Sequence, residues 1–213
     1  MTSSNLIRIG GLVAVVAGTL LLLADLWNLL MEFIVGGSEN FSEFAVTTSW
    51  TVLSATYLIG GLLLLVALVG LYAHQSEAAG TLGLVGFLAA LVGTGLLAGM
   101  FWTMAFVVPS AAIEAPAFLD AEQVAGPLDM GFMLSGIVVA LGWALFGLAT
   151  LRARVFPRVA AIVLIIGALL TVLPLPATTL VIDVAVAWLG LALLSGQRRS
   201  ASDTAVRAQP RVQ

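Results

Sequence analysis

The chain has 213 residues, of which 61% are hydrophobic and only 9% are charged, and its formal net charge is −3. Soluble domains carry about 25% charged residues, so the composition excludes an ordinary soluble domain and indicates a membrane protein. Without cysteine there are no disulfides or thiolate metal sites, and without lysine there is no Schiff base and no Walker A loop. The single histidine, His74, excludes a multi-histidine zinc site. We therefore expect neither a cofactor nor a protein-bound metal.

Long apolar segments dominate the chain, and crossing a bilayer as a helix takes roughly 20 such residues. The first segment follows a short tail at 1–5 and is longer than the apolar core of a signal peptide, which has about 7–15 residues, so we interpret it as a retained membrane helix. The expected membrane helices are 6–30, 50–73, 81–107, 129–151, 158–174 and 178–195. The predicted fold is an all-α bundle of six transmembrane helices, followed by a disordered tail at 196–213.

The fifth segment, 158–174, is the weakest of the six. At a rise of 1.5 Å per residue it would reach about 26 Å, slightly short of a hydrocarbon core of roughly 30 Å. Pro157 suits the first turn of this helix, and Pro174 and Pro176 would end it in a tight turn. The alternative is a hairpin over 158–195 that never fully crosses the bilayer.

The charges indicate the orientation, because short cytoplasmic loops collect positive residues. Threading the six helices back and forth places every basic residue on one side and nearly all acidic residues on the other. The basic residues are Arg8, Arg152, Arg154, Arg158, Arg198, Arg199, Arg207 and Arg211. We expect a multi-pass protein of the inner (plasma) membrane with both termini in the cytoplasm and with the loops 31–49 and 108–128 outside.

Acidic residues near the outer helix ends are the candidate functional groups. Asp25 and Asp183 each lie about five residues inside a predicted helix, roughly 7 Å into the apolar layer, and the outer half offers no basic partner. Asp25, Asn28 and Glu32 follow i, i+3, i+7 spacing, and Asp129 enters its helix at a similar depth. We hypothesise that these five residues converge on an outward-facing acidic pocket for a cation, a proton or another ligand. The alternative is that Glu32 and Asp129 are solvated helix-end residues, with Asp129 as a helix cap.

Small residues at four-residue spacing indicate close helix packing, because lipid offers no hydrophobic drive for association. The alternative interpretation is a homodimer seam or a gate hinge. Such spacings occur at Gly10, Ala14 and Gly18, at Gly95 and Gly99 with Gly86 and Gly93 nearby, and at Gly136 and Ala140.

Two other segments have local interpretations. Arg152, Arg154 and Arg158 flank the fourth and fifth helices, where they are expected to set topology and to contact anionic lipid headgroups. The segment 109–128 alternates acidic and apolar residues between prolines, which suits either a short helix lying on the outer surface or an irregular loop.

Residues 142–148 (GWALFGL) and 152–159 (RARVFPRV) carry a resemblance. There the chain resembles a widespread group of uncharacterised bacterial membrane proteins with six helices and a basic, proline-containing loop between helices four and five. The likeness covers roughly 129–175 and implies a six-helix fold, but it implies no activity and no functional residue.

For function, we expect a non-catalytic integral membrane protein that associates with lipid, with a partner membrane subunit or with a second copy of itself. It is not expected to be an enzyme. The chain has no GxSxG-type serine motif to form a hydrolase triad with its single histidine, His74, and the aspartates lack the glycine-containing motifs of intramembrane proteases. Arginines confined to helix ends offer no surface for nucleic acid. The alternative is a small cation- or proton-coupled transporter or channel that uses the acidic pocket. Because a transport path needs polar residues along its depth and the inner helix halves are aliphatic, the sequence favours the first function.

Overall fold

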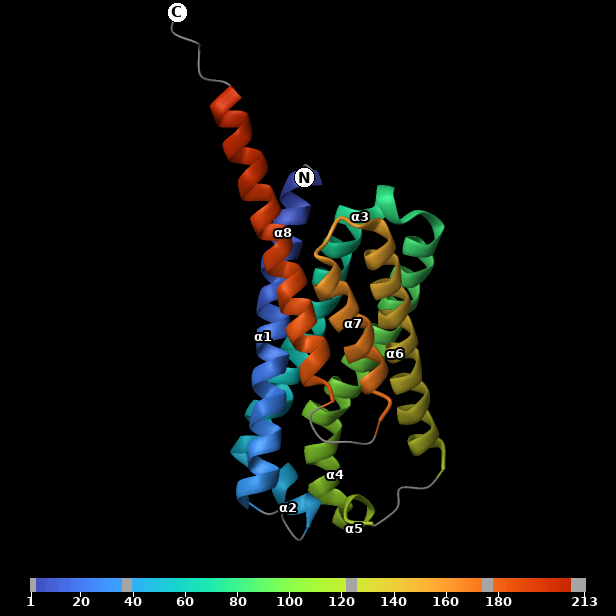
Figure 1. Ribbon diagram of the computed structural model, residues 1–213. Helices are drawn as coiled ribbons and strands as arrows, with labels where there is room; N and C mark the ends of the chain where they lie inside the picture. Colours follow the sequence, from blue (N-terminus) through green and yellow to red (C-terminus); the bar gives the residue numbers. More distant parts are fainter. Residues whose placement is uncertain (1–2, 36–39, 122–125, 174–177, 208–213) are drawn as a thin grey trace, which may run out of the picture.

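The structure, a computed structural model, describes residues 3–35, 40–121, 126–173 and 178–207, and this part of the chain is helical throughout, with short turns (Figure 1). The all-α prediction is therefore confirmed for these residues. The helices are α1 Ser3–Val35, α2 Phe41–Ala45, α3 Thr48–Trp102, the π-helix η1 Thr103–Val107, α4 Val108–Glu114, α5 Pro116–Leu119, α6 Pro127–Ala153, α7 Arg158–Leu170 and α8 Leu180–Arg207. Three helical stretches, Asn5–Met31, Thr48–Glu114 and Pro127–Ala153, are long and apolar enough to cross a membrane.

Helix α3 is two antiparallel arms that meet at Gly80. Gly80 has φ 56° and ψ −149°, a conformation that essentially only glycine adopts, and the chain reverses there (Figure 1). The ring of Tyr72 in the first arm stacks on that of Phe87 in the second, with centroids 4.3 Å apart. The arms correspond to the predicted segments 50–73 and 81–107, and the second continues through η1 into α4.

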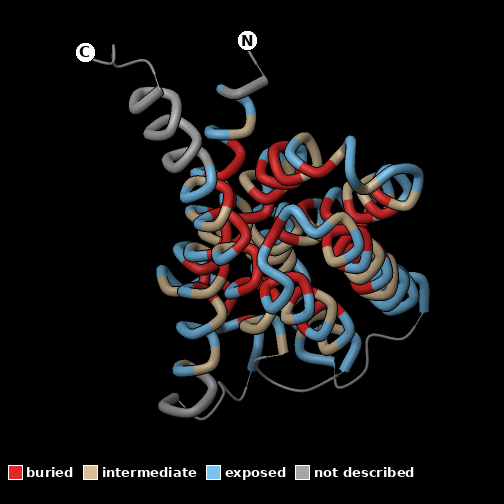
Figure 2. The backbone as a smooth tube through the Cα atoms, turned by 45° about the horizontal axis from the view of Figure 1, so that its top comes forward, coloured by how far each residue is buried: buried red, intermediate tan, exposed pale blue. Residues whose placement is uncertain are grey.

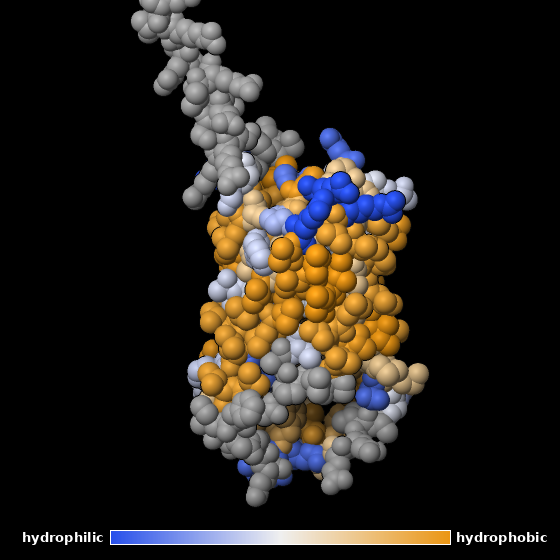
Figure 3. Space-filling model, viewed as in Figure 1, coloured by the Kyte–Doolittle hydropathy of each residue, from blue (hydrophilic) through white to orange (hydrophobic). Residues whose placement is uncertain are grey.

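Apolar side chains cover the outside of the bundle as well as its interior. Leu12, Val52, Val92 and Leu141 are all more than half exposed, while the buried residues face inward (Figure 2). An apolar band therefore crosses the middle of the visible face, and hydrophilic residues lie at the two ends of the bundle (Figure 3). A helix that is hydrophobic all round belongs in a core or in a membrane.

The two ends of the bundle carry opposite charges. We call them the arginine end and the acidic end, and the C-terminal part of α8 projects beyond the arginine end (Figure 1). The arginine end holds Arg8, Arg152, Arg154 and Arg158, and the acidic end holds Glu43, Glu114, Asp120 and Asp129.

Helix lengths differ from the sequence expectation in ways that matter for the site. Helix α7 has 13 residues and ends at Leu170, so it is about 20 Å long. Pro174 disfavours helical backbone at Leu173, which explains the early end, although Pro174 and Pro176 lie outside the described residues. Because α8 begins only at Leu180, the hairpin of α7 and α8 stops short of the acidic ends of α1 and α6 (Figure 1).

Two other helices are longer than expected. Helix α1 continues past residue 30 to Val35. Helix α8 runs to Arg207, into the segment 196–213 that was expected to be a disordered tail. No glycine or proline lies between Gly196 and Pro210 to end it.

Only some of the predicted small-residue contacts exist. Gly10 of α1 meets Gly70 of α3, and a Cβ added at Gly18 would lie 2.6 Å from the carbonyl oxygen of Asp183 in α8. The stripe Gly10, Ala14, Gly18 thus packs against two different helices. The prediction was wrong for Gly95, Gly99 and Gly136, where an added Cβ would meet nothing within 4 Å. Helices α3 and α6 instead approach at Gly86, Gly93 and Gly142, since Gly95 and Gly99 lie on another face of the helix.

The close contact at Gly18 predicts how substitutions there change the free energy of unfolding. Gly18→Ala would push α8 from α1 and should lower the free energy of unfolding by about 1–3 kcal/mol. The matched change Gly95→Ala meets open space and should be neutral or stabilising by up to about 1 kcal/mol, because alanine favours helix. Thermal unfolding of the two variants in the same detergent compares them. Equal losses would contradict this account of helix packing.

Candidate functional site

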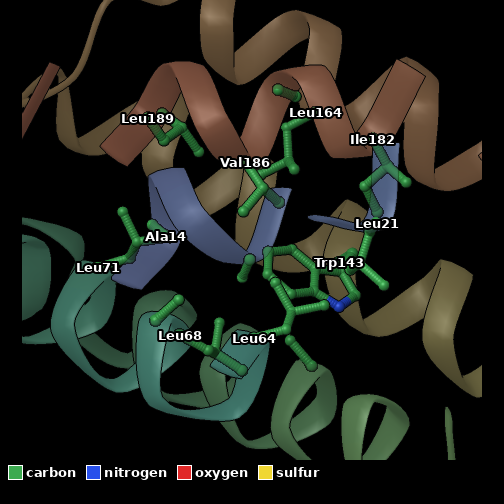
Figure 4. Close-up of a cluster of buried hydrophobic side chains, with 14 of the residues drawn as sticks. Ala14, Leu21, Leu64, Leu68, Leu71, Trp143, Leu164, Ile182, Val186 and Leu189 are labelled. Carbon is green, nitrogen blue, oxygen red and sulfur yellow. The ribbon is translucent and has the colours of Figure 1, made fainter. Parts of the chain in front are cut away.

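A cavity of about 330 Å³ lies in the acidic half of the bundle, between α1, α3, α6 and α8. Its wall is mainly apolar and includes Leu53, Phe101, Phe132 and Ile182. Other wall residues, Leu64, Trp143 and Val186, also belong to the core cluster. Figure 4 shows these three side chains beside Leu68, Leu71 and Leu189, so the floor of the cavity is the packed core.

Asp25 of α1 and Asp183 of α8 come together on the cavity wall. The Tyr57 hydroxyl donates a hydrogen bond of 2.6 Å to Asp25 Oδ1. The Asp183 carboxyl is close enough to that of Asp25 for their charges to interact. Asp183 is only 6% exposed, and its Oδ2 atom has no hydrogen-bond partner among the described residues. A buried acceptor without a donor is costly, so this atom points to a missing ligand.

The short hairpin explains how Asp183 reaches this position. Asp183 lies in the first turn of α8, where its backbone N–H bonds the Thr179 carbonyl at 3.2 Å, and not five residues inside a helix as expected. It is buried nevertheless, because α8 begins deeper in the bundle than the acidic ends of α1 and α6. Gly18 and Gly167 let α1 and α7 approach the backbone of Ile182 and Asp183 within van der Waals distance.

The other residues of the hypothesised pocket fare differently. Asn28 lines the cavity, with its side chain exposed. Glu32 belongs to α1, but its side chain lies outside the described residues. Asp129 is exposed in the first turn of α6 and does not line the cavity, so the solvated alternative fits it. Its expected role as a cap is wrong, since Gly126 is the N-cap of α6.

Sequence reasoning misses Tyr57, because its bond to Asp25 joins residues 32 apart on different helices. The available signal is that Tyr57 is one of only two tyrosines in the chain and lies within an apolar segment. It also misses Gln75, which is fully buried and has no hydrogen-bond partner for Nε2 or Oε1 among the described residues. Gln75 lies near the arginine end of α3, away from the cavity.

The arginines between α6 and α7 lie at the arginine end of the bundle. Arg152, Arg154 and Arg158 are all exposed, which suits headgroup contact, and that contact stays a prediction. Arg154 closes α6 in the left-handed conformation, with φ 58°, and its N–H bonds the Thr150 carbonyl at 3.3 Å.

At the acidic end, short helices cover the bundle. The segment from 109 onward forms α4 and α5, so it is helical and not irregular as far as the structure describes it. Asp120, after α5, accepts hydrogen bonds from the Ser42 backbone N–H at 2.8 Å and from the Ser42 hydroxyl at 2.7 Å. We call this pair the clasp. In addition, Trp50 Nε1 donates to the Met104 carbonyl of η1 at 3.1 Å.

The clasp should open in acid. The Ser42 hydroxyl, and after it the Ser42 backbone N–H, lower the pKa of the exposed Asp120 carboxyl from its ordinary value of 3.8. A lowered pKa means that the clasp is fully formed above 3.8 and is lost as the pH falls through the lowered value. Hydrogen exchange of the Ser42 amide, corrected for its intrinsic rate, should therefore show protection at about pH 6 that is lost in acid, as the pH falls through the lowered pKa of Asp120.

The variant Asp120→Ala should remove the protection of Ser42 at every pH, while amides in α3 stay protected as an internal reference. Protection of Ser42 that is the same at both pH values, or that survives Asp120→Ala, would show that the clasp does not hold this end.

The described residues contain no group of three or more histidine, cysteine, aspartate or glutamate side chains that could hold a metal ion. The geometry offers instead a carboxyl pair with one free acceptor in an apolar cavity. In comparisons with known proteins, the chain matches no protein-family model, no curated protein and no solved structure.

Proposed function

We propose that the protein is a multi-pass integral membrane protein of the plasma membrane. Four segments, α1, the two arms of α3 and α6, are long enough to cross the bilayer. The shorter α7 and the apolar part of α8 would be the fifth and sixth segments, as a hairpin that stops short of the acidic end. The lengths and apolar surfaces of the helices support this, and the gathering of arginines at one end supports a cytoplasmic arginine end with both termini inside. The acidic end, with the cavity, would then face outward.

We infer further that the pair of Asp25 and Asp183 binds an exchangeable proton or cation from the outside. The observation that carries this is the burial of Asp183 beside Asp25 on the wall of a cavity that no arginine lines. Two carboxylates this close in apolar surroundings cannot both stay ionised unless a cation joins them. A proton and a cation therefore compete for one site.

Such competition is the elementary step of a cation/proton-coupled transporter. The packing argues against a channel, since the fully buried Leu68, Leu71, Leu164 and Leu189 fill the half of the bundle beyond the cavity. A transporter needs no continuous pore, because it exposes its site to the two sides in turn. Buried polar termini of short helices near the middle of the membrane are typical of transporter sites.

The geometry thus favours the function that the sequence placed second. Association with lipid or a partner subunit stays a prediction, because the exposed apolar side chains are those of any lipid-facing helix. That the protein is not an enzyme also stays a prediction.

Flux through proteoliposomes tests the proposal. An imposed gradient of a suitable cation should move protons in the opposite direction, and a pH-sensitive dye inside the vesicles should report it. Asp25→Asn and Asp183→Asn should each slow the exchange at least about tenfold. The neutral asparagine amide can neither release a proton nor bind a cation by charge, so the exchange of one for the other is lost. Asp129→Asn, an exposed aspartate off the cavity wall, is the matched control and should exchange like the native protein.

The panel should include Na⁺, K⁺, Mg²⁺ and several organic ammonium ions. If native vesicles exchange none of them faster than protein-free vesicles, transport is not the function of this protein.

A further inference from the structure

The chemistry of the cavity wall identifies the class of cation, an inference that rests on the proposed cation site. A site for a hard metal ion surrounds the ion with oxygen atoms: six to eight for Ca²⁺, and a near-ideal octahedron for Mg²⁺. Here the acidic ligands on the wall are Asp25 and Asp183, and the Tyr57 hydroxyl already donates its proton to Asp25. The absence of any larger acidic group in the described residues also argues against a metal ion.

Apart from the polar side chains of Asn28, Ser135, Thr171 and Thr179, the rest of the wall is apolar and suits hydrocarbon. Phe101, Phe132 and the stacked ring of Tyr57 present aromatic surface, and Met100 and Met104 are flexible apolar side chains that adapt to a ligand's shape. Aromatic faces attract organic cations, and apolar groups of a ligand gain from burial against this wall. A volume of about 330 Å³ lies at the small end of ligand cavities, which is enough for a single-ring molecule.

The unpaired oxygen of Asp183 indicates which charged group a ligand would carry. Asp183 Oδ2 is buried and lacks a donor among the described residues, and the carboxyl that interacts with Asp183, that of Asp25, is acidic as well. An ammonium N–H would supply both the missing donor and the missing positive charge. A quaternary ammonium would supply only the charge, so the geometry favours a primary or secondary amine.

We propose that the cavity binds a protonated primary or secondary amine with an apolar or aromatic group, whose N–H donates to Asp183 while its apolar part lies against Phe101, Phe132 and the methionines. On binding, one ammonium ion enters and the proton held by the carboxyl pair leaves to the outer solution, so the charge in the cavity does not change. An inorganic cation gains nothing from the apolar wall.

Calorimetric titration of the purified protein in detergent with 2-phenylethylammonium tests this. Repeating the titration in buffers of different ionisation enthalpy counts released protons, and the expected result is about one per ligand, with affinity falling as the pH falls. Neutral 2-phenylethanol and the small methylammonium ion should each bind at least about tenfold more weakly, since one lacks the charge and the other the apolar group. Asp183→Asn should lose at least about tenfold in affinity, and Asp129→Asn should lose none.

A second pair of variants tests the apolar wall without touching the carboxyl groups. Gly136 lines the cavity and has no atom within 4 Å of an added Cβ, so Gly136→Leu would occupy space meant for the ligand. It should weaken 2-phenylethylammonium binding at least about tenfold. Gly131→Leu, on the same helix but off the cavity wall, also meets open space and should leave binding unchanged.

The outcomes separate the two proposals. If inorganic cations exchange with protons in vesicles but 2-phenylethylammonium does not bind, the amine assignment is wrong and the cation site stands. Binding that is equal for 2-phenylethanol, or unaffected by Gly136→Leu and Asp183→Asn, would also overturn the amine assignment. If no cation of either kind binds or exchanges, both proposals fail.

Discussion

The meeting of two carboxyl groups, Asp25 and Asp183, in an apolar layer without a basic partner is the constraint on which the account depends. Charge burial in such a layer is tolerated only with a proton, a counter-ion or hydrogen bonds. Tyr57 provides one hydrogen bond, to Asp25, and leaves Asp183 Oδ2 unsatisfied. In the proposed function a positive charge satisfies this atom, and the surrounding wall decides which positive charge fits.

The helix lengths and the close approach of α1 to α8 create this place. A full-length α7 and α8 would fill the acidic half of the bundle and would carry Asp183 toward its outer surface. Because the hairpin is short, the first turn of α8 lies at depth, with Gly18 against its backbone. The helix N-terminus also favours a negative group there, which helps to hold Asp183 when it is ionised. The same shortness leaves the volume that a ligand would occupy.

Much of this could be predicted from the sequence, and the failures have physical causes. Hydropathy indicated the helical segments, and the isolation of Asp25 and Asp183 from arginine marked them as candidates. Hydropathy could not place the early end of α7, because backbone restriction before Pro174 ends that helix while its residues are still apolar. The contact of Asp25 with Tyr57 depends on how two helices are rotated, which no local pattern encodes.

Cross-linking tests the central claim most directly, since the chain contains no cysteine of its own. The double variant Asp25→Cys/Asp183→Cys, carrying a protease site within 122–125, would be treated with a short bifunctional thiol reagent and then cleaved. The account predicts that the two fragments stay joined until the link is reduced. It also predicts that the fragments of Arg8→Cys/Asp183→Cys separate, because Arg8 lies on the same fragment as Asp25 but at the arginine end of α1. Free fragments from the first variant and joined fragments from the second would contradict it.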